Sequence, residues 1–121
     1  MKKYLLIIFG MLFFVSAAFA QDFAYKPVGF QMITIDSTTG GIGLNPGSAD
    51  RAIIVVETAN LRFCVTESCA PTSSFGTPLD MGQAWVLETI DEVKNFKAIR
   101  TGSTSAKISV IYMKSYRVTS Q

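Results

Sequence analysis

The two cysteines of this 121-residue chain, Cys64 and Cys69, are the residues whose types and spacing point most directly to chemistry. An even number of cysteines in an exported domain is typical of a disulfide, and this spacing fits a bridge across a tight loop. A zinc site needs two further cysteine or histidine ligands, and the spacing differs from that of a redox Cys-x-x-Cys motif. We therefore predict a structural disulfide, with free thiols and a redox or metal role as the alternatives.

The chain contains no histidine. This composition excludes Ser-His-Asp and Cys-His catalysis and most zinc and copper sites. Paired carboxylates can still perform acid–base chemistry, and the candidates for such a pair are Glu57, Glu88, Asp91 and Glu92. Asp91 and Glu92 belong to an Asp-Glu-x-Lys pattern, which favours a solvated helical turn. We expect no catalytic residue and no enzyme.

Three aspartates, Asp36, Asp50 and Asp80, lie in or beside predicted loops. Carboxylate oxygens of this kind bind calcium when several of them are closely spaced in one loop. The chain has no loop of regularly spaced Asp and Asn residues, so we expect neither a metal site nor a cofactor.

Aromatic side chains offer a second kind of site, a platform on which a sugar ring stacks. Trp85 lies between Ala84 and Val86 in an apolar segment, where core packing is the default. Tyr112 and Tyr116, near the end of the chain, are expected to be better exposed. Carbohydrate binding through these three aromatic residues is the alternative function.

The first twenty residues predict export. Lys2 and Lys3 precede an apolar run, and Ala18-Phe19-Ala20 fits the small-x-small pattern that signal peptidase recognises. The run is shorter than the roughly 20 apolar residues of a membrane-spanning helix. We therefore predict a cleaved signal peptide over 1–20, no stable membrane span after cleavage, and a secreted or periplasmic location.

Cleavage changes the charge balance of the chain. The full sequence has 11 basic and 9 acidic residues, and Lys2 and Lys3 belong to the predicted signal peptide. Basic and acidic residues are therefore equal in number over 21–121, which is the length of one domain. A nucleic-acid-binding surface needs a surplus of Lys and Arg on one face, so we expect no nucleic acid partner.

Strand-forming segments alternate with loops rich in Gly, Pro and Ser along the rest of the chain. The predicted strands are 28–36, 51–58, 60–66, 84–87, 96–101 and 106–113. The loops are 37–49, where Ile42 and Leu44 should contact the core, and 67–78, and one helical turn is expected at 91–94. This pattern predicts an all-β fold, a small antiparallel β-sandwich of six to eight short strands with a jelly-roll-like arrangement.

Three features predict how these strands face and pair. Val28, Phe30 and Met32 share one parity and Ile35 has the other, which indicates a switch of facing at a bulge near Met32. The segment 51–58 is apolar on both parities, which predicts a strand buried on both faces.

A hairpin turn at Ala59-Asn60 would place Glu57 and Arg62 opposite each other. A cross-strand ion pair at this position would contribute from a few tenths of a kcal/mol to about 1 kcal/mol. We interpret that pair as structural.

A longer pattern runs through the middle of the chain. It consists of Arg51–Phe63, Ala70-Pro71-Thr72, Gly76–Leu79, Gly82 and Asn95–Arg100. With these residues, the segment Ala49–Met113 resembles a small β-domain found among tailed-phage virion and tail-associated proteins and in prophage-rich genomes. The resemblance implies a non-enzymatic structural or attachment module in a symmetric assembly. The chain differs from that pattern between its two cysteines, where an Asp-Asp-Gly-type turn is expected, and in its predicted signal peptide.

The sequence thus predicts a secreted, non-enzymatic structural or interaction module in a virion-like or cell-surface assembly. A near-neutral domain rich in apolar residues associates readily, so self-association or a protein partner is expected. The alternative is a carbohydrate-binding module, whose partner would be a glycan.

Overall fold

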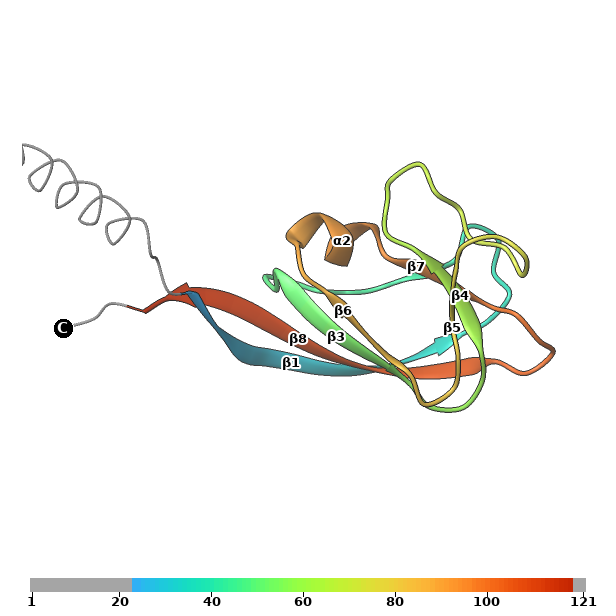
Figure 1. The fold of residues 1–121 in the computed structure, drawn as a ribbon, viewed down its shortest axis with the longest axis horizontal. Helices are drawn as coiled ribbons and strands as arrows, with labels where there is room; N and C mark the ends of the chain where they lie inside the picture. Colours follow the sequence, from blue (N-terminus) through green and yellow to red (C-terminus); the bar gives the residue numbers. More distant parts are fainter. Residues whose placement is uncertain (1–22, 119–121) are drawn as a thin grey trace, which may run out of the picture. The chain divides into compact units, whose positions relative to one another are not determined.

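The computed structural model describes residues 23–118 and contains two antiparallel sheets of four strands each (Figure 1). The strands are β1 (Phe23–Ile35), β2 (Ile42–Gly43), β3 (Arg51–Val56), β4 (Leu61–Cys64), β5 (Thr77–Leu79), β6 (Ala84–Leu87), β7 (Lys97–Arg100) and β8 (Ala106–Arg117). The predicted signal peptide lies outside the described residues. Tyr25–Ser115 form one compact unit, and the described residues before and after it belong to a second.

The strand order follows from one long hairpin formed by the described residues. One sheet has the order β1-β8-β3-β6 and the other β2-β7-β4-β5. The first strand therefore lies beside the last, the second beside the seventh, the third beside the sixth and the fourth beside the fifth. Successive strands of each arm alternate between the two sheets, which is the double-sheet arrangement of a jelly roll. The predicted all-β sandwich is confirmed.

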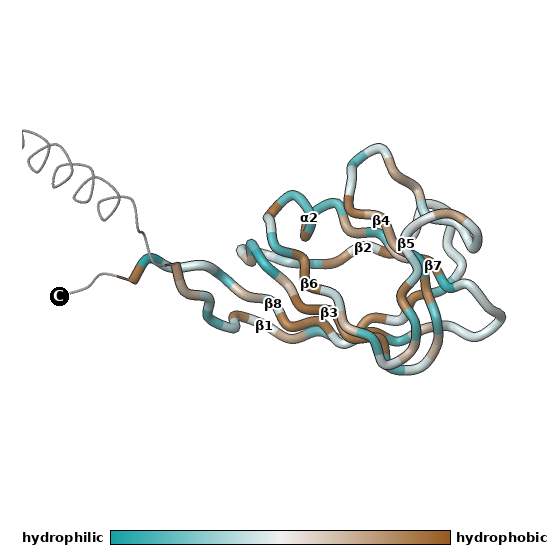
Figure 2. Tube along the Cα trace, viewed as in Figure 1, coloured by the Kyte–Doolittle hydropathy of each residue, from teal (hydrophilic) through white to brown (hydrophobic). Residues whose placement is uncertain are grey.

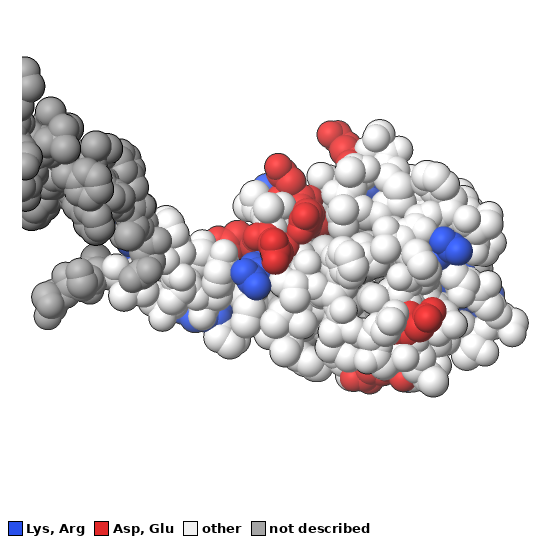
Figure 3. All heavy atoms as spheres, viewed as in Figure 1, with Lys and Arg blue, Asp and Glu red and all other residues white. Residues whose placement is uncertain are grey.

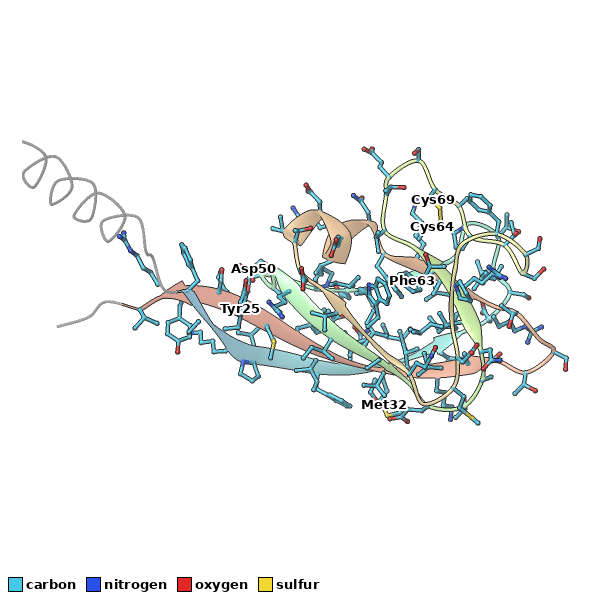
Figure 4. The ribbon with its side chains drawn as sticks, in the orientation of Figure 1. Tyr25, Met32, Asp50, Phe63, Cys64 and Cys69 are labelled. Atoms are coloured by element: carbon cyan, nitrogen blue, oxygen red, sulfur yellow. A yellow bond between two sulfur atoms is a disulfide. The ribbon has the colours of Figure 1, made fainter. Side chains whose placement is uncertain are left out.

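The core lies between the inner faces of the two sheets. Alternate residues of β3, Ala52, Ile54 and Val56, are fully buried, and the inward residues of β8 face the same interior. Phe63 of β4 lies at the centre (Figure 4) and is only 2% exposed. Its ring is 5.2 Å from that of Trp85 and 5.5 Å from that of Phe96. Phe63 therefore joins the two sheets, since Trp85 belongs to the opposite one.

Helix α2 (Ile90–Asn95) connects β6 to β7 and begins where a helical turn was predicted. The Thr89 hydroxyl accepts a hydrogen bond from the Glu92 N–H at 3.2 Å, and the Glu92 carboxylate accepts one from the Glu88 N–H at 2.7 Å. The first bond is an N-cap bond that satisfies one of the amides that a helix start leaves unpaired, and the second connects the residue before the cap to the same turn. Val93, which is fully buried, anchors the helix to the core.

The predicted hairpin between β3 and β4 is wrong. β3 pairs with β6 and β8, whereas β4 pairs with β5 and β7, so the turn at Ala59-Asn60 carries the chain from one sheet to the other. The expected ion pair is therefore also wrong. Arg62 donates to the Gly76 carbonyl at 2.7 Å, and the Glu57 carboxylate accepts a hydrogen bond from Ser109.

Two short strands lie in segments that were predicted to be loops. β2 pairs with β7, where Ile42 lies opposite Ala98, and β5 pairs with β4, where Pro78 lies opposite Arg62. Proline removes one backbone donor, which a strand at the margin of a sheet tolerates. The expected contact of Ile42 and Leu44 with the core is confirmed.

The facing of two strands also differs from expectation. Exposure alternates without interruption from Phe30 to Ile35, so facing does not switch at Met32. In β3, Ile53 and Val55 are only half-buried, so this strand is fully buried on one face alone. Both strands therefore direct one apolar set of side chains inward and another outward.

Phe63→Ala tests the central position of this ring. We expect the free energy of unfolding to fall by about 3 to 5 kcal/mol, because the substitution leaves a cavity between the sheets. Phe75→Ala is the matched control, since Phe75 is 60% exposed. Denaturant titration measures both variants, and equal losses of stability would contradict the described core.

Candidate interaction surface

The sheet of β1, β8, β3 and β6 carries apolar side chains on the side that faces away from the other sheet. Successive residues of a strand point to opposite faces, so the residues between the buried ones point outward. The apolar residues of this outer face are Val28, Phe30, Met32, Ile53, Val55, Val86, Ile111 and Met113, and Thr34, Arg51, Lys107 and Ser109 share the same side. Four strands at about 4.8 Å spacing make a surface about 19 Å wide.

The pairing register makes the outer face continuous. Ile53 lies directly between Ile111 of β8 and Val86 of β6. Side chains at directly opposed positions have Cβ atoms about 4.5 to 5.5 Å apart, so these three form one row across the sheet. β1 lies beside β8 and extends this row to the margin. Figure 2 shows the hydrophobic stretches of β1, β8 and β3 next to each other.

The β1 side chains are the most exposed part of the outer face. Phe30 is 65% exposed and Met32 is 53% exposed. Figure 4 shows Met32 on the side of the sheet away from Phe63. Contiguous apolar surface of this kind marks interaction sites more often than single exposed residues do.

Arg51 and Lys107 are charged residues with the outward parity of β3 and β8. Figure 3 shows acidic side chains gathered near helix α2, within a surface that is mostly uncharged. The Arg51 guanidinium lies 4.4 Å from the centre of the Tyr25 ring, at the end of β3 where Met113 is its neighbour. Such a cation–π contact holds the charge against an aromatic ring beside the apolar row.

Two of the candidate aspartates have structural partners. The Ser115 hydroxyl and amide both donate to Asp50, and these bonds hold the pKa of that carboxyl below its usual range although burial opposes them. Thr38 does the same for Asp36. Within residues 23–118, no three His, Cys, Asp or Glu side chains gather in a way that could hold a metal ion.

The three aromatic candidates do not form one platform. Tyr112 is only 5% exposed, so its expected exposure is wrong. Its hydroxyl donates to the Gln31 side chain at 2.6 Å and accepts from the Asn45 amide at 3.2 Å. Burial raises the pKa of this hydroxyl. Trp85 is 43% exposed but packs edge-on against Phe63, and Tyr116 is exposed.

A shallow hollow of about 450 Å³ lies beside Tyr112. Its wall is formed by Val28–Gln31 on one side and by Asn45–Ser48 on the other. The Gln31 carboxamide oxygen and the Asn45 amide already bond to the Tyr112 hydroxyl, so these two polar groups serve the fold.

Cys64 and Cys69 form the predicted disulfide. Cys64 is the last residue of β4, and the bridge closes the start of the loop that leads to β5 (Figure 4). The Cys69 amide bonds to the Thr66 carbonyl at 3.2 Å, and the Lys97 ammonium bonds to the Glu67 carbonyl at 3.3 Å. The disulfide therefore fixes the tip of the long hairpin into which the chain folds.

Sequence reasoning missed the outer face although its residues were visible in the pattern. The shared parity of Val28, Phe30 and Met32 predicts a bulge near Met32, and apolar residues on both parities of 51–58 predict a strand buried on both faces. In the structure, the apolar residues of one parity line the outer face instead. The missing signal was the number of layers, because a two-layer sandwich covers only one face of each sheet.

Among the described residues, 23–118, no helix is long and apolar enough to cross a membrane. No family model, curated protein or solved structure is significantly similar to this chain.

Removal of the disulfide should destabilise the domain. We expect Cys64→Ala/Cys69→Ala to lower the free energy of unfolding by about 2 kcal/mol, because the cross-link restricts a short loop in the unfolded chain. Denaturant titration measures the change, and intact mass before and after reduction checks that the native protein is about two hydrogens lighter than the reduced form. Two alkylatable thiols in the native protein would refute the bridge.

Acid should weaken the Asp50–Ser115 contact. The folded pKa of Asp50 is lowered from 3.8, so its contribution to stability is present above that pH and is lost as pH falls through the folded value. We expect Asp50→Asn to lose less stability than the native protein between neutral and strongly acid pH. Asp80→Asn is the control of equal charge, and thermal melts across pH measure all three proteins. Parallel acid profiles for the native protein and Asp50→Asn would contradict the assignment.

Proposed function

We propose that this protein is an exported, non-enzymatic structural module that assembles with copies of itself. The observation that carries this proposal is the outer face, which has apolar side chains on all four strands of one sheet and which no other element of residues 23–118 covers. An apolar surface left in water costs free energy that burial against another surface recovers, at about 25 cal/mol per Å². The β1 side chains are the most exposed and form the expected contact region.

Balanced charge supports self-association. Residues 21–121 contain equal numbers of basic and acidic side chains, so copies of this chain do not repel one another through net charge. The resemblance to small β-domains of tailed-phage virions adds to this proposal, because such modules act in symmetric assemblies at a virion or cell surface.

Export is part of the proposal. It depends on the pattern of Lys2, Lys3 and Ala18-Phe19-Ala20, and the disulfide is compatible with an oxidising compartment such as the periplasm or the exterior.

Sedimentation equilibrium tests the assembly. We expect protein purified after expression of the full chain to self-associate at high micromolar concentration, and to stay associated in high salt because the contact is apolar. Phe75→Ser is the control for non-specific association, since Phe75 is exposed on a loop outside the outer face and its loss should leave association unchanged.

A strict monomer at high micromolar concentration would overturn the proposal. In that case the carbohydrate alternative is tested, first by the change in Trp85 fluorescence on addition of sugars and then by a glycan array. Absence of binding to diverse glycans would exclude it.

A further inference from the structure

β1 has a free edge. It is the margin strand of its sheet, next to β8, and among the described residues no strand pairs with its other edge (Figure 1). Residues Tyr25–Phe30 are all exposed, on both parities. The side chains of this stretch are therefore accessible on both faces of the sheet. The unpaired N–H and C=O groups of such an edge are a template for another strand.

Most of this edge also lacks the charged residues and prolines that prevent the edge strands of two molecules from pairing. Natural edges carry charged side chains, proline or bulges. Here Lys26 and Pro27 protect the beginning of the strand, but Val28–Ile35 contains neither a charge nor a proline. This segment is rich in residues that favour strands, so it is well suited to pair.

The charges on either side of this segment favour one orientation of pairing between two copies. Lys26 precedes the uncharged stretch and Asp36 follows it. When a strand pairs with a copy of itself in antiparallel orientation, its beginning lies opposite the partner's end. Unlike charges then meet at both ends. Parallel pairing would instead place Lys26 beside Lys26 and Asp36 beside Asp36, which is unfavourable.

The facing of the side chains restricts the register. Paired residues of neighbouring strands point to the same face, and Phe30 and Met32 point outward while Gln31 points toward Tyr112. A two-fold axis at Gln31 satisfies this condition and places Phe30 opposite Met32 on both sides of the axis. In the same register Lys26 lies near the end of the partner's β1, which Asp36 follows. The thioether of methionine also packs favourably against an aromatic ring.

We propose that two copies of this chain pair through their β1 edges, antiparallel and with the two-fold axis at Gln31, to form a continuous eight-stranded sheet. The contact is isologous, so one strand supplies both sides of it. Main-chain hydrogen bonds between the edges hold the pair together, and the Phe30–Met32 contacts determine its register. This inference rests on the proposed self-assembly and names the surface responsible for it.

Sedimentation equilibrium of a charged variant tests the edge. Phe30→Lys/Met32→Lys places like charges opposite each other twice, and we expect the dissociation constant to rise at least tenfold. Phe75→Lys/Met81→Lys is the matched control, since it changes the same two residue types at exposed positions outside this strand. The control should stay within about twofold of the native protein, and circular dichroism checks that both variants fold.

Cross-linking tests the register. We expect a mixture of Phe30→Cys and Met32→Cys proteins to form a disulfide-linked dimer under mild oxidation, and each variant alone to form little. A dimer from Phe30→Cys alone would overturn this register. An assembling mixture that gives no cross-link would overturn β1 pairing while the proposed function stands, whether or not Phe30→Lys/Met32→Lys assembles. A native protein that is monomeric at every concentration would overturn both.

Discussion

Every part of this domain depends on burial between two sheets that share one interior. Phe63 occupies the middle of that interior and contacts rings that come from both sides of it. The strands reach these positions because the chain doubles back on itself and its two arms roll together. Residues far apart in the sequence therefore meet, which favours a folded state only when the burial exceeds the entropy lost in closing such long loops.

The same constraint produces the interaction surface. A sheet in a two-layer sandwich has one covered face and one uncovered face, so strands that are apolar on both parities must leave one set of side chains in water. β1, β3 and β8 leave apolar side chains outward in this way, and the outward residues of β3 and β8 lie directly opposite each other in their pairing. Packing against another surface would cover this face, whereas pairing at the free edge of β1 would extend the face across two copies.

The polar residues that looked suitable for chemistry serve the architecture instead. Glu92 completes the start of helix α2, Asp50 accepts hydrogen bonds from Ser115, and Tyr112 connects Gln31 to the loop that contains Asn45. Each group satisfies a donor or acceptor that the fold would otherwise leave unpaired. In residues 23–118, every buried side-chain nitrogen or oxygen has a hydrogen-bond partner.

The sequence by itself determined the all-β class, most strand positions and the disulfide. Apolar residues spaced two apart, turn residues and paired cysteines are local signals, and strands β3, β6 and β8 and the Cys64–Cys69 bridge match them. Only the tertiary structure decided which strands pair and which apolar set faces out. Leu61–Cys64 looked like the hairpin partner of β3, yet it pairs with β5 and β7, because neighbouring strands here cross between sheets. Pairing and facing are set by the number of layers and by contacts between distant segments, and a local pattern contains neither.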